Sequence, residues 1–170
     1  LLFGMLEGVM IGTVLSLLLL VWRASNPSTV LLGRIPGTEL YSDLARHPDN
    51  EIEPGSLVFR VNAGLFYANA PNVKADLMEA IGQQGKAVRL VVIDLSSSPY
   101  VDVAAADMLA ECHEELAGQG ITLRVSNMNG EVRDMMRRDG LDKVFGDLGP
   151  AQSVESIVGQ WKKAGARASQ

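Results

Sequence analysis

The chain has 170 residues, enough for one domain with an appendage, and carries 15 Lys and Arg against 20 Asp and Glu, a net charge of −5. This acidic balance argues against nucleic-acid binding, because such proteins usually present a basic surface. The one cysteine, Cys112, excludes an intramolecular disulfide and multi-cysteine zinc sites, and His47 and His113 are too few and too distant for a metal site. We therefore expect no metal, no cofactor and no nucleic-acid partner. Because the chain begins at Leu1 rather than at Met, we expect it to be a fragment of a longer protein.

Residues 1–22 read LLFGMLEGVMIGTVLSLLLLVW, an apolar run with one acidic and no basic residue. As a helix rising about 1.5 Å per residue, this run is long enough to cross a hydrocarbon core of roughly 30 Å. A signal peptide would need a basic leader and a shorter apolar core. A buried core helix is the other alternative, because Glu7, Thr13 and Ser16 interrupt the run. The pattern favours a transmembrane helix over 1–22.

The flanks of this helix predict its orientation. Trp22 suits a membrane interface, and Arg23 follows it directly, which places the residues after 22 in the cytoplasm of a cell-membrane protein. Small residues recur at every fourth position of the helix: Gly4, Gly8, Gly12 and Ser16. Such a stripe lets helix backbones approach closely, so we expect the helix to belong to a bundle.

After a linker over 23–28, residues 29–165 alternate between strand-like and helix-like segments and end in a short tail over 166–170. The predicted strands are 29–32, 57–61, 88–95 and 121–125, with a further extended piece over 65–67. The predicted helices are 72–81, 103–117, 131–138 and 153–163, several of them ended by glycine. This alternation favours a small α/β layer with parallel pairing. The candidate core residues are Val58, Val61, Val91, Val92, Ile93, Leu109, Leu123 and Trp161.

Several catalytic motifs are excluded by their own spacing. The segment 82–87 has Ala80 and Ala87 where a P-loop needs glycine and a hydroxyl residue, and it precedes a strand rather than a helix. A nucleophile elbow of the form G-x-S-x-G is missing from the sequence. Cys112 and His113 are adjacent on a predicted helix and therefore point apart, so a buried structural cysteine is favoured over a catalytic dyad. We expect no catalytic residue.

One segment, 94–106, joins a buried strand to a helix and carries polar residues at the strand end. Asp102 is a suitable N-cap for the helix that follows it. Because open α/β sheets bind ligands beyond the carboxyl ends of their strands, Asp94, Ser96 and Asp102 are the candidate ligand or partner site. The alternative is a capped helix that binds no ligand.

The same segment, DLSSSPYVDVAAADML, resembles the signature of STAS domains, which occur in sulfate transporters and in anti-sigma factor antagonists. In that family a buried strand ends in Asp-x-Ser and a second Asp starts the next helix. The antagonists place a phosphorylatable Ser directly after this second Asp, whereas this chain has Val103, Ala104 and Ala105 there. The chain therefore departs from the phosphorylation-controlled branch.

Three further motifs resemble the SulP anion transporters. Residues 6–16 are similar to the last membrane helix of that family, residues 32–38 (LGRIPGT) to its connector, and residues 59–70 to its strand pair ending in a Tyr-Ala-Asn-Ala turn. Within that turn the resemblance gives Tyr67 and Asn69 a structural role. It implies a STAS-type mixed sheet of about four to five strands flanked by helices and preceded by one transmembrane helix.

The resemblance also implies a function: a cytoplasmic regulatory and assembly domain of a homodimeric secondary transporter for sulfate, bicarbonate or a related anion. Its partners would be the rest of the membrane domain, a second copy and the lipid bilayer. Some STAS domains bind nucleotides or acyl carrier protein, which the resemblance leaves open here. Two other readings remain: a phosphorylation-controlled antagonist-type binding module and a membrane-tethered α/β enzyme.

Overall fold

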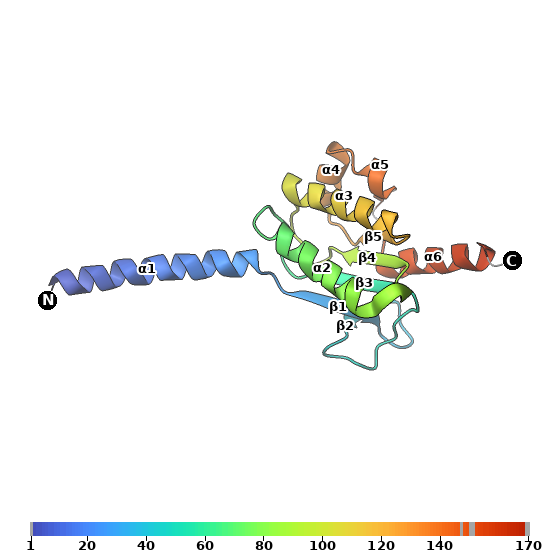
Figure 1. The fold of residues 1–170 in the computed structure, drawn as a ribbon, viewed down its shortest axis with the longest axis horizontal. Coiled ribbons are helices and arrows are strands. Elements are labelled where there is room, and N and C mark those ends of the chain that lie inside the picture. The colour runs from blue at the N-terminus through green and yellow to red at the C-terminus, as the bar shows by residue number, and fades with distance from the viewer. Residues whose placement is uncertain (1, 147, 150–151, 169–170) are drawn as a thin grey trace.

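The computed structural model describes residues 2–146, 148–149 and 152–168, and consists of a long N-terminal helix that projects from a small α/β domain (Figure 1). In chain order the elements are α1 (Leu2–Ser25), β1 (Thr29–Arg34), β2 (Tyr41–Asp43), β3 (Ser56–Val61), α2 (Ala70–Gln84), a 3-10 turn η1 (Gly85–Ala87), β4 (Leu90–Asp94), α3 (Val103–Gly118), β5 (Thr122–Ser126), α4 (Gly130–Arg138), α5 (Asp142–Phe145) and α6 (Val154–Ala168).

The five strands form one mixed sheet in the order β2-β1-β3-β4-β5. β1 pairs antiparallel with both β2 and β3, whereas β3, β4 and β5 are parallel. Parallel neighbours need a crossover connection, and α2 and α3 supply the two crossovers here. The predicted STAS-type mixed sheet is therefore confirmed, although the predicted parallel pairing applies to only three of the strands.

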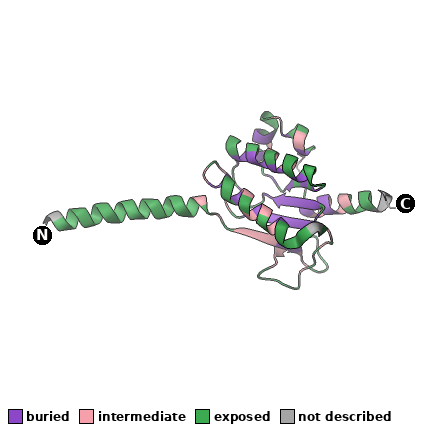
Figure 2. Ribbon diagram, in the orientation of Figure 1, coloured by how far each residue is buried: buried purple, intermediate pink, exposed green. Residues whose placement is uncertain are grey.

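Helices cover both faces of the sheet, and Figure 2 shows the strands β3 and β4 as the buried centre. The larger core lies between the sheet and the helices α2, α3 and α4, with Leu77, Leu109 and Met136 as representative contributors. The smaller core lies on the other face, where Val154 and Ile157 of α6 pack with strand residues such as Val92. Because both faces are covered, every residue of β4 is buried.

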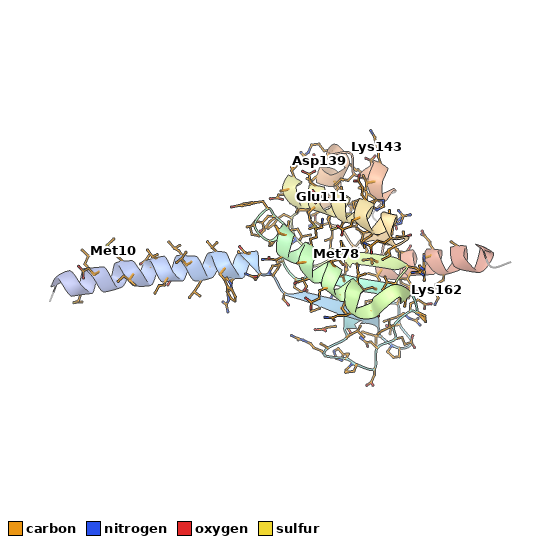
Figure 3. All side chains as sticks on the ribbon, in the orientation of Figure 1. Met10, Met78, Glu111, Asp139, Lys143 and Lys162 are labelled. Atoms are coloured by element: carbon orange, nitrogen blue, oxygen red, sulfur yellow. The ribbon has the colours of Figure 1, made fainter. Side chains whose placement is uncertain are left out.

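The helix α1 takes no part in either core. Its segment Gly4–Ser25 has a mean hydropathy of 2.1 and none of it is buried, so by length and composition α1 is a candidate membrane span. Figure 3 shows the side chain of Met10 projecting from α1 with no other element beside it. The predicted boundaries of span, linker, domain and tail stay predictions.

The structure corrects several local predictions. The strand β2 and the helix α5 were not expected, because they have three and four residues and too little sequence to show a period. Over 65–67 only Leu65 is bridged, to Val101, and a turn follows instead of an extended segment. The strand predicted over 88–95 is confined to Leu90–Asp94. Trp161 is only partly buried and packs against the smaller core.

Candidate functional site

The carboxylate of Asp94 lies at the carboxyl end of β4 and has no solvent exposure. Its Oδ2 accepts hydrogen bonds from Arg60 Nε at 2.7 Å and Ser96 Oγ at 3.1 Å, and its Oδ1 accepts from Ser96 N and Asn127 Nδ2, both at 3.0 Å. Arg60 is the register partner of Asp94 on β3, and Asn127 directly follows β5. One carboxylate thus joins the ends of all three parallel strands.

The four donors occupy all of the lone-pair positions of this carboxylate. A buried carboxylate is costly unless it is paired and fully hydrogen-bonded, and this arrangement meets that requirement. In this structure Asp94 therefore has no free acceptor position for a ligand. The candidate binding role of Asp94 and Ser96 stays a prediction, although the structure does place the two side chains together.

Asn127 is a further residue of this site that the sequence did not predict. Its φ of 53° lies in the left-handed region, where asparagine is among the few non-glycine residues found routinely. The backbone turn at Asn127 follows β5, and the side chain bonds Asp94. An asparagine directly after a strand, as here, was the only signal available in the sequence.

Asp102 caps α3 as predicted, and it also holds a second segment of the chain. Its Oδ1 accepts a hydrogen bond from Ala105 N at 2.8 Å, and its Oδ2 accepts one from Tyr67 N at 2.9 Å. The backbone N–H of Asp102 donates to the Leu65 carbonyl at 3.0 Å. Asp102 thus fastens the turn before α2 to the first turn of α3. The carboxylate of Asp102 therefore contacts the turn at Tyr67 and not the residues that bond Asp94.

Asn69 is completely buried and closes the turn that precedes α2. Its Oδ1 accepts a hydrogen bond from Phe66 N at 3.0 Å, while its Nδ2 donates to the carbonyl of Gly64 at 2.9 Å. The same Nδ2 lies 3.4 Å from the carbonyl oxygen of Ala24, near the end of α1. The side chain of Tyr67, by contrast, is 73% exposed. These contacts make Asn69 the residue through which the turn meets the long helix.

The loop between Asp94 and Asp102 is held at its far end by Asn129. Asn129 Nδ2 donates to the Pro99 carbonyl at 2.8 Å, and its Oδ1 caps α4 by accepting from Val132 N at 2.9 Å. Within the loop, Ser98 is buried, whereas Ser96 is exposed. The loop therefore connects β4 to α3 and is also fixed to the start of α4 through Asn129, and Ser96 lies at its accessible surface.

Cys112 behaves as the predicted structural cysteine. It is fully buried on α3, and its Sγ lies 3.6 Å from Met108 Sδ. Burial raises the pKa of the Cys112 thiol to about 11, which disfavours the reactive thiolate form. Within the described part of the chain, no group of three or more His, Cys, Asp or Glu residues could hold a metal ion.

Residues 47–157 match the family model of the STAS domain. Probable sulfate transporter 4.2 of Arabidopsis thaliana is 30% identical over 153 residues, which cover 85% of this chain and 23% of that protein. Low affinity sulfate transporter 3 of Stylosanthes hamata is 31% identical over 167 residues, which cover 89% of this chain and 26% of that protein. The chain thus spans about a quarter of the length of these curated relatives.

Two solved structures share the fold. The structure of SLC26A9 superposes with a TM-score of 0.75 at 16% identity, over 96% of this chain and 28% of that chain. The unphosphorylated anti-sigma factor antagonist SpoIIAA superposes with a TM-score of 0.50 at 18% identity, over 65% of this chain and 94% of that chain. At these identities the likeness establishes the fold alone.

Proposed function

Because the chain belongs to the STAS domain family, we propose that it is the C-terminal part of a membrane transporter for sulfate or a related anion. In this proposal α1 is the last membrane helix of the transporter, and the α/β domain is its cytoplasmic regulatory and assembly module. The rest of the membrane domain and a second copy of the protein are its partners.

The observation that carries this proposal is the extent of the similarity along the chain. The match to the Stylosanthes hamata transporter covers 89% of the chain, which is more than the residues after Ser25 can supply. The similarity therefore continues from the domain into α1, in a protein named as a sulfate transporter. An antagonist-type domain attached by chance to an apolar helix would not give this continuity.

The orientation follows from the end of α1. Trp22 and Arg23 lie in its last two turns and are exposed, with Arg23 as the basic residue of the last turn. Aromatic residues favour the membrane interface and basic residues the cytoplasmic side, which supports a cytoplasmic domain. A second basic residue, Arg34, lies at the end of β1 and also favours a cytoplasmic location for the domain.

A binding or assembly role fits the polar residues of the domain better than catalysis does. Asp94 and Asp102 both use their carboxylate oxygens to hold the fold, as their hydrogen bonds to strand ends and backbone amides indicate. Cys112, the one thiol, is buried. These observations leave a membrane-tethered enzyme without an evident nucleophile in the described part of the chain.

The antagonist-type alternative has less support. The first turn of α3 begins with Val103, Ala104 and Ala105, so no hydroxyl follows Asp102 at the position where the antagonists are phosphorylated. The likeness to SpoIIAA covers only the fold. We therefore keep the transporter reading as the proposal.

Membrane topology provides the first test. Glu39→Cys is placed on the exposed hairpin turn between β1 and β2, and Gly4→Cys near the other end of α1. An impermeant maleimide should label position 39 only from the cytoplasmic side of membrane vesicles and position 4 only from the outside. Labelling of both positions from one side would contradict the span.

Transport provides the second test, in the complete protein that carries this chain. Reconstituted in liposomes, it should take up radiolabelled sulfate, and truncation after Ser25 should change the rate or the dimer fraction. Absence of anion uptake, or identical behaviour after truncation, would count against the proposal. The single substitution Cys112→Ala, in the core, is the control for effects of expression and reconstitution that any variant would show.

A further inference from the structure

We propose that an exposed aromatic patch, formed by Phe66, Tyr67, Tyr100 and Val103, lies in the headgroup region of the bilayer beside the cytoplasmic end of α1. This inference rests on the proposed function, since it needs α1 to span the membrane. It adds to that function a second membrane contact, made by the α/β domain itself.

The patch is an unusual surface for a domain in water. Tyr67 is 73% exposed, Val103 58% and Tyr100 51%. The half-buried ring of Phe66 joins the two tyrosines, with ring centroids 5.9 Å from Tyr67 and 6.3 Å from Tyr100. None of these side chains carries a formal charge at neutral pH. The two exposed tyrosine rings, which both contact the ring of Phe66, form a contiguous surface that favours a partner. Val103 directly follows Asp102, whose carboxylate bonds Tyr67 N, so it belongs to the same part of the domain.

The backbone beneath the patch is held rigidly by hydrogen bonds. Leu65 N donates to the Tyr100 carbonyl at 3.0 Å, and Tyr67 N donates to Asp102 Oδ2 at 2.9 Å. A Cβ atom on Gly64 would lie 2.4 Å from the ring of Tyr100, so only glycine lets this ring lie against the turn. The patch is therefore preorganised, which lowers the entropy cost of binding.

The patch is placed at the end of α1. Asn69, in the same turn, lies 3.4 Å from the Ala24 carbonyl, and Asn72 of α2 bonds the Ser25 carbonyl at 2.8 Å. Figure 1 shows the first turns of α2 and α3 on the side of the domain from which α1 departs. If α1 crosses the bilayer up to Trp22, the turn that carries Tyr67 lies at the depth of the lipid headgroups.

The chemistry of the patch fits that depth. Tyrosine has an apolar ring and a polar hydroxyl, and it is enriched where a membrane meets water. The carboxylate of Asp102, which contacts the patch at Tyr67 N, has both oxygens bonded to backbone N–H groups, which reduces its repulsion from lipid phosphates. Leu40 is comparably exposed at 66%, but it lies beyond the far end of β1 and so provides a matched control.

The test measures the depth of spin labels on the 170-residue chain in phosphatidylcholine nanodiscs. The variants are Tyr67→Cys and Val103→Cys in the patch, Leu40→Cys as the distal control, and Leu18→Cys in α1 as the reference for the span. Because Cys112 is buried, we expect it to take up little spin label, and labelling of the parent chain measures this background. Oxygen, which partitions into lipid, and a water-soluble nickel chelate are the two relaxing agents.

We expect the ratio of oxygen to nickel accessibility at positions 67 and 103 to exceed that at position 40 several-fold and to lie below that at position 18. Ratios at 67 and 103 equal to that at 40, with position 18 in lipid, would overturn this inference and leave the span intact. A low ratio of oxygen to nickel accessibility at position 18, which indicates a label in water, would instead contradict the proposed span. Shielding of 67 and 103 from both agents would indicate a protein contact and would also overturn the lipid assignment.

Discussion

The side-chain amide of Asn72 donates a hydrogen bond to the backbone carbonyl oxygen of Ser25 at 2.8 Å. Ser25 is the last residue of α1, and Asn72 lies in the first turn of α2. The last carbonyls of a helix have no partner within it, so side chains from elsewhere can satisfy them. The same amide of Asn72 donates to Asn26 Oδ1 at 3.2 Å, directly after α1. Because α1 buries no residue in the domain, its direction relative to the sheet is set by these hydrogen bonds.

Asn72→Ala is expected to loosen this junction without destabilising the domain. Asn72 is exposed, so the change in free energy of unfolding should stay within about 0.5 kcal/mol. The distance distribution between spin labels on α1 and α2 should broaden, because one of the hydrogen bonds that orient α1 is lost. Gln83→Ala, near the other end of α2, is the control. An unchanged distribution would contradict the role assigned to Asn72.

Asp94→Ala should destabilise the domain by about 3–5 kcal/mol, because it leaves Arg60 without its carboxylate in a largely buried position. Urea unfolding followed by circular dichroism measures the change. Asp107→Ala, at an exposed position on α3, is the control and should cost less than about 0.5 kcal/mol. A loss below 1 kcal/mol for Asp94→Ala would show that the strand ends do not depend on this carboxylate.

Asp102→Ala removes the acceptor of two backbone N–H groups, and the expected cost is about 2 kcal/mol. Asp102→Asn can keep the cap on Ala105 while presenting its NH2 group to Tyr67 N. Hydrogen exchange should therefore accelerate at the Tyr67 amide in both variants but at the Ala105 amide mainly in the alanine variant. Equal protection of Tyr67 in the parent chain and the asparagine variant would refute the second contact.

The free energy of unfolding is expected to depend on pH in the alkaline range because of Tyr41. Burial, together with the hydrogen bond from its hydroxyl to Glu155 Oε2 at 3.0 Å, raises the pKa of Tyr41 well above its usual value. An unfolded tyrosine titrates near pH 10, so this contribution to stability is complete below about pH 10 and falls as the pH rises above it.

Tyr41→Phe should accordingly lose about 1 kcal/mol at neutral pH and show a shallower loss of stability at alkaline pH than the parent chain. Urea unfolding at about pH 8 and about pH 11, on either side of the titration of unfolded tyrosine, makes the comparison. Tyr100→Phe, at an exposed position, is the matched control. Parallel pH profiles of Tyr41→Phe and the parent chain would contradict the assignment.

Residues 29–170 should fold without α1, because both hydrophobic cores are formed by residues of the domain. The exposed leucines and valines of α1 would cost about 25 cal/mol per Å² in water, so the complete chain should need detergent or lipid. A cooperative thermal transition and a discrete small species in detergent-free buffer would support this division. An unfolded or aggregated product would mean that α1 is required for the domain.

Local patterns were sufficient for the principal elements. The helix predicted over 103–117 is Val103–Gly118, and the apolar run over 88–95 contains the buried strand β4, because helical periodicity and a continuous apolar run are properties of neighbouring residues. The motif around Asp94 and Asp102 predicted the family, which the matches to the STAS domain and the sulfate transporters confirm. The helix cap at Asp102 was also readable, since its partner Ala105 is three residues away.

The sequence by itself determined the family, the longer helices and strands of the domain, and the apolar helix that precedes it. Only the tertiary structure decided that Asp94 is saturated by Arg60 and Asn127, and that Asn69 reaches the end of α1. These partners lie 33 to 45 positions apart in the chain. The two bonds to Asp94 form only when the parallel strands bring their carboxyl ends together. The contact between Asn69 and Ala24 depends instead on the antiparallel pairing of β1 with β3. Neither pairing leaves a periodic trace in the sequence around these residues.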